Sequence, residues 1–277
     1  MKQGVHRRSF MCAANVSFQK TAWDMSPGLR RCIRYPVFHA LFFILLSAIA
    51  APLAVSADTG RGYLDLGGGY KTGDFGTTTT SGLYYLSPTV GYVAPGYDVS
   101  ITVPYLFLTN KTGSQSRTES GAGDIILRGG AVFIPEGPTG FSLNGTLALK
   151  LPTADETRGL GTGETDYGAF LGLHQWIGNV KLSLTGGYIK IGDPAAINYN
   201  DIYLYGVGIS RVFGGTNIAA SLDNRRAMVP GAQNPQEVSV GFFHVLNVDY
   251  AIRGSAFKGL NNGGPDFGAD FGIVRWF

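Results

Sequence analysis

Short segments in which apolar and polar residues alternate recur throughout residues 58–277. The clearest runs from Phe141 to Leu151, where Ser, Asn, Thr and Lys separate the apolar side chains. Successive side chains of a β-strand point to opposite faces, so each segment predicts a strand with one apolar and one polar face. This part of the chain shows no helical periodicity, and none of its apolar runs approaches 18 residues. The pattern restricts the chain to an all-β fold.

The alternation predicts twelve strands, and their connections differ in a regular way. The predicted strands are residues 61–71, 83–94, 97–108, 123–134, 141–151, 165–177, 180–191, 201–213, 216–226, 237–246, 249–260 and 266–277. Short turns such as Pro95-Gly96 and Gly178-Asn179 follow the even-numbered strands, and mostly longer polar loops follow the odd-numbered ones. Short turns on one side, long loops on the other and an even strand count are typical of a transmembrane antiparallel up-and-down β-barrel. We expect Pro88 and Pro104 to disturb the ladder locally, because each lacks a backbone N–H.

The cations on the apolar face test this topology. A cation facing lipid costs about 2–4 kcal/mol near the bilayer midplane and much less at the interface. Arg211 and Arg275 lie near short turns, and Lys190, Arg226 and Lys258 lie at the long-loop ends of their strands. We expect those last three to contact lipopolysaccharide phosphates. Tyrosines expected to form aromatic girdles at the two interfaces are Tyr92, Tyr97, Tyr188, Tyr203, Tyr205 and Tyr250.

Residues 1–57 differ in kind from the rest and predict a leader. Three arginines, Arg30, Arg31 and Arg34, precede an apolar run of about 14 residues, which is short for a membrane-spanning helix of roughly 20. A small-residue pattern then predicts a secretory signal peptide cleaved between Ala57 and Asp58. An uncleaved anchor is the alternative, and Met25 would give a leader of more usual length. The barrel then comprises residues 58–277, and the predicted location is the outer membrane of a Gram-negative bacterium.

Charge and cysteine content exclude several functional classes. The chain carries 22 basic and 19 acidic residues, but seven of the basic and one of the acidic residues lie in the leader. The remainder has a net charge of −3, which excludes a nucleic-acid-binding function. Both cysteines, Cys12 and Cys32, also lie in the leader, so the predicted barrel needs no disulfides.

The polar face predicts a wet lumen. Its candidate lining residues include Asp65, Arg128, Asn144, Arg253 and Asp270. Arg253, Asp270 and Asp65 lie on strands eleven, twelve and one, which become neighbours only when the barrel closes. We expect an ion-pair group across that seam. The alternative is that these side chains fill space without selecting any solute.

The last predicted strand, DFGADFGIVRWF, has one apolar face and ends on the aromatic Phe277. It resembles the C-terminal strand of bacterial outer-membrane barrels, whose terminal aromatic residue serves as an assembly signal. The resemblance implies recognition by the outer-membrane assembly machinery. We expect this strand to pair with the first, which leaves no open edge.

Residues 150–168 read KLPTADETRGLGTGETDYG. They resemble the phenol meta-pathway family of outer-membrane transport proteins, in which a Lys-Leu-Pro-Thr strand end precedes a Gly-rich loop and an acidic-Asp-Tyr strand start. The residues that carry the resemblance are Pro152, Thr153, Gly161, Gly163, Glu164, Asp166 and Tyr167. The resemblance implies a barrel that serves pathways for aromatic or other hydrophobic compounds.

Physically, Gly161 and Gly163 are expected to adopt backbone angles closed to other residues. The acids Asp155, Glu156, Glu164 and Asp166 crowd into one external loop, where solvated turn chemistry or a bridging divalent cation would accommodate them. A phosphate cradle is excluded, because no Lys-Ser/Thr follows and the charge is negative. We predict no metal site and no cofactor.

The sequence favours a channel that passes small compounds, aromatic or hydrophobic ones among them, across the outer membrane. A non-conducting structural or adhesive barrel is the alternative. An open pore, a gated channel and a plugged barrel all fit the sequence. A lipid-modifying enzyme is disfavoured, because His174 and His244 are the only histidines after residue 57 and neither lies near the outer leaflet in this topology.

Overall fold

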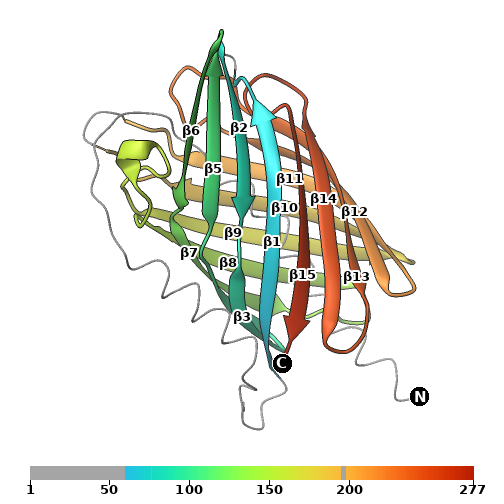
Figure 1. Ribbon diagram of the computed structural model, residues 1–277. Coiled ribbons are helices and arrows are strands. Elements are labelled where there is room, and N and C mark those ends of the chain that lie inside the picture. Colours follow the sequence, from blue (N-terminus) through green and yellow to red (C-terminus); the bar gives the residue numbers. More distant parts are fainter. Residues whose placement is uncertain (1–59, 76, 195–197) are drawn as a thin grey trace.

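The fold is a closed antiparallel β-barrel with the C-terminus at one rim (Figure 1). A computed structural model describes residues 60–75, 77–194 and 198–277. The predicted leader, its cleavage site at Ala57 and Asp58 and the alternative start at Met25 lie outside the described residues.

Among the described residues, fifteen strand segments follow one another with a single turn of 3-10 helix, η2 (Glu156–Arg158). The segments are β1 (Arg61–Gly73), β2 (Thr79–Leu86), β3 (Thr89–Ala94), β4 (Tyr97–Thr102), β5 (Tyr105–Thr112), β6 (Gln115–Ala122), β7 (Ile125–Ile134), β8 (Phe141–Leu151), β9 (Asp166–Ile177), β10 (Val180–Lys190), β11 (Ile202–Phe213), β12 (Thr216–Arg225), β13 (Gln236–Val245), β14 (Tyr250–Gly259) and β15 (Phe267–Trp276). β2 with β3, β4 with β5 and β6 with β7 each form one broken strand, so the barrel has the predicted twelve strands.

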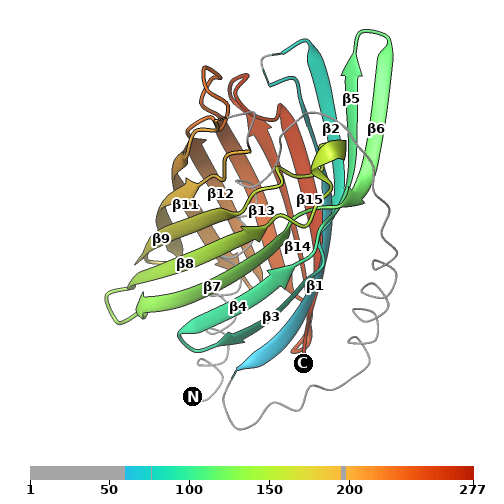
Figure 2. The same cartoon turned by 90° about the vertical axis from the view of Figure 1, so that its left-hand side faces the viewer.

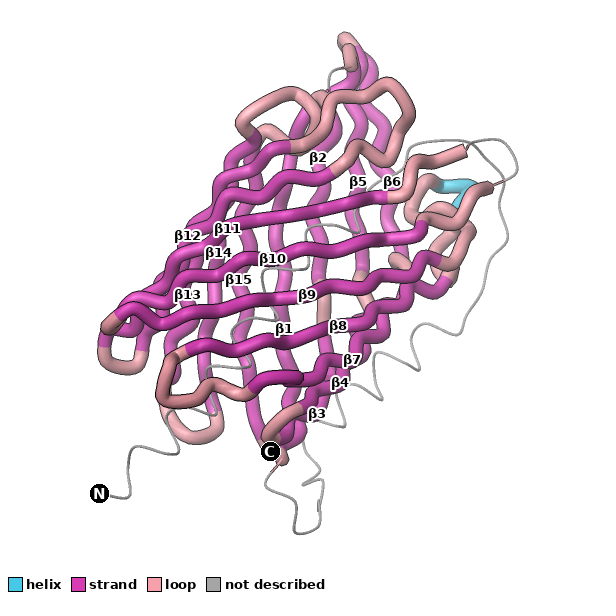
Figure 3. The backbone as a smooth tube through the Cα atoms, turned by 180° about the vertical axis from the view of Figure 1, so that it is seen from behind, coloured by secondary structure: helices cyan, strands magenta, loops and turns pink. Residues whose placement is uncertain are grey.

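The barrel closes where β15 pairs with β1. Their register runs from Tyr63 opposite Trp276 to Thr72 opposite Phe267. The backbone N–H of Phe277 donates to the carbonyl oxygen of Gly62 at 2.9 Å, which extends the ladder to the last residue. The predicted pairing of the first and last strands is therefore confirmed. Figure 3 shows the continuous wall on the opposite side of the barrel.

Apolar side chains cover the outside of the barrel. The exposed large hydrophobic side chains there include Leu66, Val99, Leu147, Leu171, Leu184, Val207, Ile209, Val240, Phe271 and Ile273. Water would not stabilise so much exposed apolar surface, whereas a bilayer does. Among the described residues, no helix has the length and hydropathy needed to span a membrane.

Three neighbouring strands break at one level. The breaks are at Ser87-Pro88, Val103-Pro104 and Gly123-Asp124, and backbone hydrogen bonds join them: Val103 N–H to Pro88 O at 3.0 Å and Gly123 N–H to Pro104 O at 2.9 Å. The disturbance of the ladder expected at both prolines is confirmed. The third break contains no proline and was not predicted. Beyond this line, β2, β5 and β6 rise above the rest of the barrel (Figure 2).

The outer part of these strands corrects one prediction. Residues 109–122 were expected to form a long loop, but β5 continues to Thr112 and β6 starts at Gln115, so only Gly113 and Ser114 form the turn. This hairpin was missed because its residues are polar on both faces, which hides the alternation. On its other side, β6 has no strand partner within the described part of the chain.

The closing strand generates the first prediction. Trp276 is 3% exposed and packs edge-on against Phe243, and Phe277 supplies the last hydrogen bond of the seam. Deletion of Trp276 and Phe277 should abolish folded barrel in membrane fractions, measured by the heat-dependent gel shift of folded barrels. Trp276→Phe should retain most of the folded protein, because it keeps an aromatic side chain at the seam. Normal membrane insertion of the deletion variant would contradict the role of the last two residues in assembly.

Candidate functional site

Arg253 is the centre of a polar group on the inner side of the seam. Its Nε and Nη2 donate to the two carboxylate oxygens of Asp65 at 2.9 and 3.2 Å, and its Nη1 donates to Asp270 Oδ1 at 2.6 Å. Ser255 Oγ donates to the other carboxylate oxygen of Asp270. The structure thus brings together the three residues expected across the seam, with Ser255 as an unforeseen fourth.

Two glycines make room for the Arg253 side chain. A Cβ atom at Gly67 would lie 2.2 Å from Arg253 Nη2, and one at Gly272 would lie 2.9 Å from its Cζ. The guanidinium therefore lies flat along β15 and β1, and Arg253 is 4% exposed. A buried cation needs such paired acceptors, because removal from water is costly.

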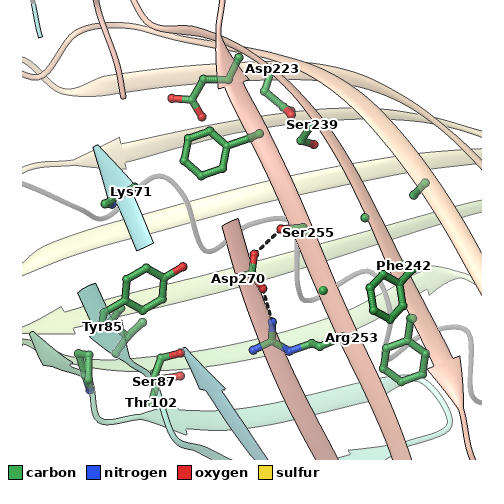
Figure 4. Close-up of a pocket in the computed structure, with 18 of the residues that line it drawn as sticks. Lys71, Tyr85, Ser87, Thr102, Asp223, Ser239, Phe242, Arg253, Ser255 and Asp270 are labelled. Carbon is green, nitrogen blue, oxygen red and sulfur yellow. Dashed lines mark hydrogen bonds and ion pairs between the residues drawn. The ribbon is translucent and has the colours of Figure 1, made fainter. Parts of the chain in front are cut away.

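One cavity of the lumen combines charged and apolar walls. Figure 4 shows the Arg253–Asp270–Ser255 group together with Tyr85 and Asp223, which line the same cavity. Its apolar lining comes mainly from Tyr85, Pro104, Leu106, Ile126, Phe243 and Phe257. Its polar lining includes Lys71, Arg128, Asp223, Glu237, Ser239 and the seam group. Of the predicted lumen residues, Arg128, Arg253 and Asp270 line this cavity, and Asp65 contacts it through Arg253.

Asn144, the remaining predicted lumen residue, lines a second and more polar cavity. There His174 Nδ1 lies 2.9 Å from Ser183 Oγ, and His174 Nε2 lies 3.1 Å from Asn144 Oδ1. With Asn144 Oδ1 as acceptor, Nε2 carries the proton and Nδ1 accepts from the serine. The three residue types match those of a Ser–His–Asn hydrolase. The surroundings of Ser183 decide whether this group could catalyse hydrolysis.

Ester hydrolysis needs free N–H groups to bind an oxyanion near the serine. Ser183 lies within β10, which pairs with β9 on one side and β11 on the other, so the ladder uses the nearby backbone N–H groups. We therefore interpret Asn144, His174 and Ser183 as a polar crosslink across three strands.

Residues 152–165 connect β8 to β9 and carry most of the resemblance described above, so this segment is called the family-motif loop. Lys150 attaches it to the barrel. Its Nζ lies 2.9 Å from Asp166 Oδ2, 3.1 Å from Asp124 Oδ2 and 2.7 Å from Thr162 Oγ1. Asp124 lies at the break between β6 and β7, and its Oδ1 accepts from the backbone N–H of Ala154 at 2.9 Å. Both ends of the loop are thus attached to the wall where the three strands break.

The middle of the loop packs against the raised strands. Leu160 is 5% exposed and packs with Leu83 and Leu108 from β2 and β5. Arg158 Nε donates to Glu119 Oε2 on β6 at 2.9 Å. The loop therefore supports the inner side of the raised strands.

These contacts correct the expectation of a solvated acidic turn for one of its four acids. Asp166 begins β9, is 3% exposed and binds the Lys150 ammonium. Asp155 accepts from the N–H of Thr157 at 3.0 Å and Glu156 is exposed, as expected of residues in a turn. No group of three or more acidic, His or Cys side chains in the described ranges could hold a metal ion. Pro152, Thr153, Glu164 and Tyr167 flank this network, and Thr153 Oγ1 accepts from the N–H of Ile125 at 2.9 Å.

The two glycines of the motif are required for different structural reasons. Gly163 adopts a φ of 74°, as expected for a residue that needs the left-handed region. Gly161 is not at positive φ; a Cβ there would lie 2.7 Å from Ala154 Cβ and 2.8 Å from Asp124 Oδ2. Close approach to the ion-pair network therefore explains Gly161.

Comparisons by sequence found no matching family and no matching curated protein. Solved structures do match. The COG4313 outer membrane channel from Pseudomonas putida F1 aligns with 82% of this chain and 100% of its own, at a TM-score of 0.65 and 15% identity. The translocator domain of the autotransporter NalP from Neisseria meningitidis aligns over 87% and 96%, at 0.51 and 14%. The KdgM porin aligns over 78% and 99%, at 0.50 and 10%. At these identities the matches show the outer-membrane barrel fold.

The lysine network generates the second prediction. Lys150→Met should lower stability by about 3–5 kcal/mol, because it leaves two buried carboxylates without their cation. The measurement is the temperature at which the folded gel band disappears. Adding Asp124→Asn and Asp166→Asn should recover part of the loss, and Lys111→Met, at an exposed lysine, should have little effect. An unchanged transition in Lys150→Met would show that the network contributes no stability.

Proposed function

We propose that this protein is an outer-membrane channel for small amphipathic compounds, aromatic compounds among them. The observation that carries the proposal is the lumen cavity in which Tyr85, Leu106 and Phe257 face the same space as charged groups. An apolar wall favours rings and alkyl groups, and the acids and hydroxyls give hydrogen bonds to polar substituents. A solute with both kinds of surface fits this lining better than a sugar or an alkane.

Two further observations support transport. The barrel shares its architecture with an outer membrane channel over that channel's whole length. The family-motif residues resemble those of the phenol meta-pathway transport family, and in this chain they are fixed to the external half of the barrel through Lys150. The proposal places the protein in the outer membrane, with its short turns toward the periplasm.

A non-conducting structural or adhesive barrel is the second candidate. The raised β5–β6 hairpin favours it, because an adhesive barrel needs a surface that projects beyond the membrane (Figure 2). The NalP translocator domain, which belongs to an autotransporter, shows that the same fold also occurs in barrels that are not named as solute channels. Planar-bilayer conductance of the refolded protein separates the candidates: discrete channel events support transport, and silence in repeated insertions supports the structural candidate.

The third prediction concerns ion selectivity. Asp270→Lys places a second cation beside Arg253 and changes the local charge by two units. At about 8 Å from a permeating ion in water, this amounts to about 1 kcal/mol, or roughly a fivefold shift toward anions at low salt. Reversal potentials across a salt gradient measure the shift. Unchanged selectivity, with conductance retained, would mean that the seam group fills space without selecting ions.

The fourth prediction concerns the apolar wall. Phe257→Ser removes an aromatic surface worth about 0.5–1.5 kcal/mol to a bound ring, so uptake of aromatic acids should fall roughly two- to tenfold relative to sugars. Liposome swelling with benzoate and with arabinose measures the ratio. Phe213→Ser is the matched control, because Phe213 is exposed at the opposite end of the barrel. An equal decrease for both solutes would contradict a role of Phe257 in selectivity.

A further inference from the structure

Two cations on the outer face lie close together at the external rim. Lys190 is the last residue of β10, and Arg226 directly follows β12; both are exposed. Tyr188 lies opposite Tyr203, and the backbone N–H of Arg226 donates to Tyr203 O at 2.8 Å. Arg226 therefore shares a row with these tyrosines, and Lys190 lies two residues farther along β10. Strand spacing and rise place the two backbones roughly 12 Å apart, which two long side chains can bridge.

The third predicted cation lies away from this pair. Lys258 on β14 lies opposite Val238 on β13, which in turn lies opposite Leu222 on β12. Leu222 precedes Arg226 by four residues. The backbone of Lys258 is therefore roughly 16 Å from that of Arg226. The structure separates the predicted set of three into a pair and a single lysine.

Tyrosines surround the pair at the same level. Lys190 lies opposite Tyr167 on β9, and the rings of Tyr188 and Tyr203 lie 5.0 Å apart. Tyr167 and Tyr203 are each 58% exposed on the outer face. Exposed tyrosines of a membrane barrel lie at the level of the lipid headgroups. The two cations therefore lie where membrane lipids carry their phosphates.

One nearby acid offsets part of this positive charge. The two carboxylate oxygens of Asp201 accept from Tyr188 OH at 2.5 Å and from Ile191 N–H at 3.0 Å. The hydrogen bond from Tyr188, with the charges of Lys190 and Arg226, lowers the pKa of Asp201, so the carboxylate stays ionised and offsets one of the two positive charges. Arg226 Nη2 donates to Asn200 Oδ1 at 2.9 Å, which orients the guanidinium. Among the described residues, no acceptor binds the ammonium group of Lys190.

We propose that Lys190 and Arg226 form a binding site for a phosphate group of lipopolysaccharide in the outer leaflet. Arg226 offers a fixed planar donor set, Lys190 offers a mobile point charge, and Tyr203 packs against the sugar and acyl parts of the lipid. The inference rests on the proposed outer-membrane location and is independent of whether the barrel conducts.

The test is binding of lipopolysaccharide to the refolded full barrel in detergent, measured by native mass spectrometry. Each cation should contribute roughly fivefold, so the Lys190→Gln/Arg226→Gln variant should bind about 25-fold more weakly. Lys258→Gln and Arg211→Gln, at cations of the same outer face, should bind like the unaltered protein. Dephosphorylated lipopolysaccharide should bind to the unaltered protein as weakly as intact lipopolysaccharide binds to the double variant.

Four results would overturn the proposal. They are equal binding by the double variant and the unaltered protein, equal loss in the Lys258→Gln control, equal binding of dephosphorylated lipopolysaccharide, and binding of phosphatidylglycerol vesicles as tightly as lipopolysaccharide vesicles. The last result would indicate a general anionic-lipid surface. The heat-dependent gel shift verifies that each variant is folded. Conductance measured on the same samples keeps the two proposals apart, because a silent barrel that binds lipopolysaccharide contradicts only the channel.

Discussion

The pairing of β15 with β1 is the interaction on which the rest of the structure depends. In the hydrocarbon core of a membrane no water replaces a missing backbone hydrogen bond, so an open sheet edge is not tolerated. Ring closure satisfies every strand at membrane level and, by the same step, brings Asp65 of β1 beside Arg253, which already lies next to Asp270 of the neighbouring strand β15. The ion pair between Arg253 and Asp65 is therefore a product of closure, and it exists only in the assembled barrel.

Much of the barrel was predictable because a membrane imposes two alternating environments. The face of each side chain follows from residue parity, which is why the seam group could be named from Asp65, Arg253 and Asp270 alone. The alternation of apolar and polar residues disappears where both faces of a strand meet water. The β5–β6 hairpin was predicted as a loop for that reason. Of the two acids that bind Lys150, Asp166 lies directly opposite it on β9, whereas Asp124 lies at a strand break that no proline marks.

The family-motif loop connects the two parts of the molecule. Lys150 and Asp166 belong to regular strands of the ring, whereas Leu160 and Arg158 contact the raised β2–β5–β6 segment. An apolar residue in a Gly- and Thr-rich loop gives little sequence signal, yet Leu160 is among the most buried hydrophobic side chains. The ion pair of Arg158 with Glu119 attaches the loop to β6, which lacks a second strand partner within the described residues. Tyr85 and Leu106, which pack against the Leu160 cluster, extend the apolar surface into the lumen cavity.

The breaks at Pro88, Pro104 and Gly123 divide each of these three strands into a membrane part and a projecting part. The sequence of each part is constrained differently. Below the breaks, residue parity is fixed by lipid and lumen, so an insertion of one residue would turn every side chain of a strand around. Above them, both faces of the outer half of β6 (residues 115–118) meet water and the hairpin ends in a two-residue turn. Evolution can therefore lengthen, shorten or exchange the projecting tip while the membrane ring stays the same, so the tip can change faster than the strands that span the membrane.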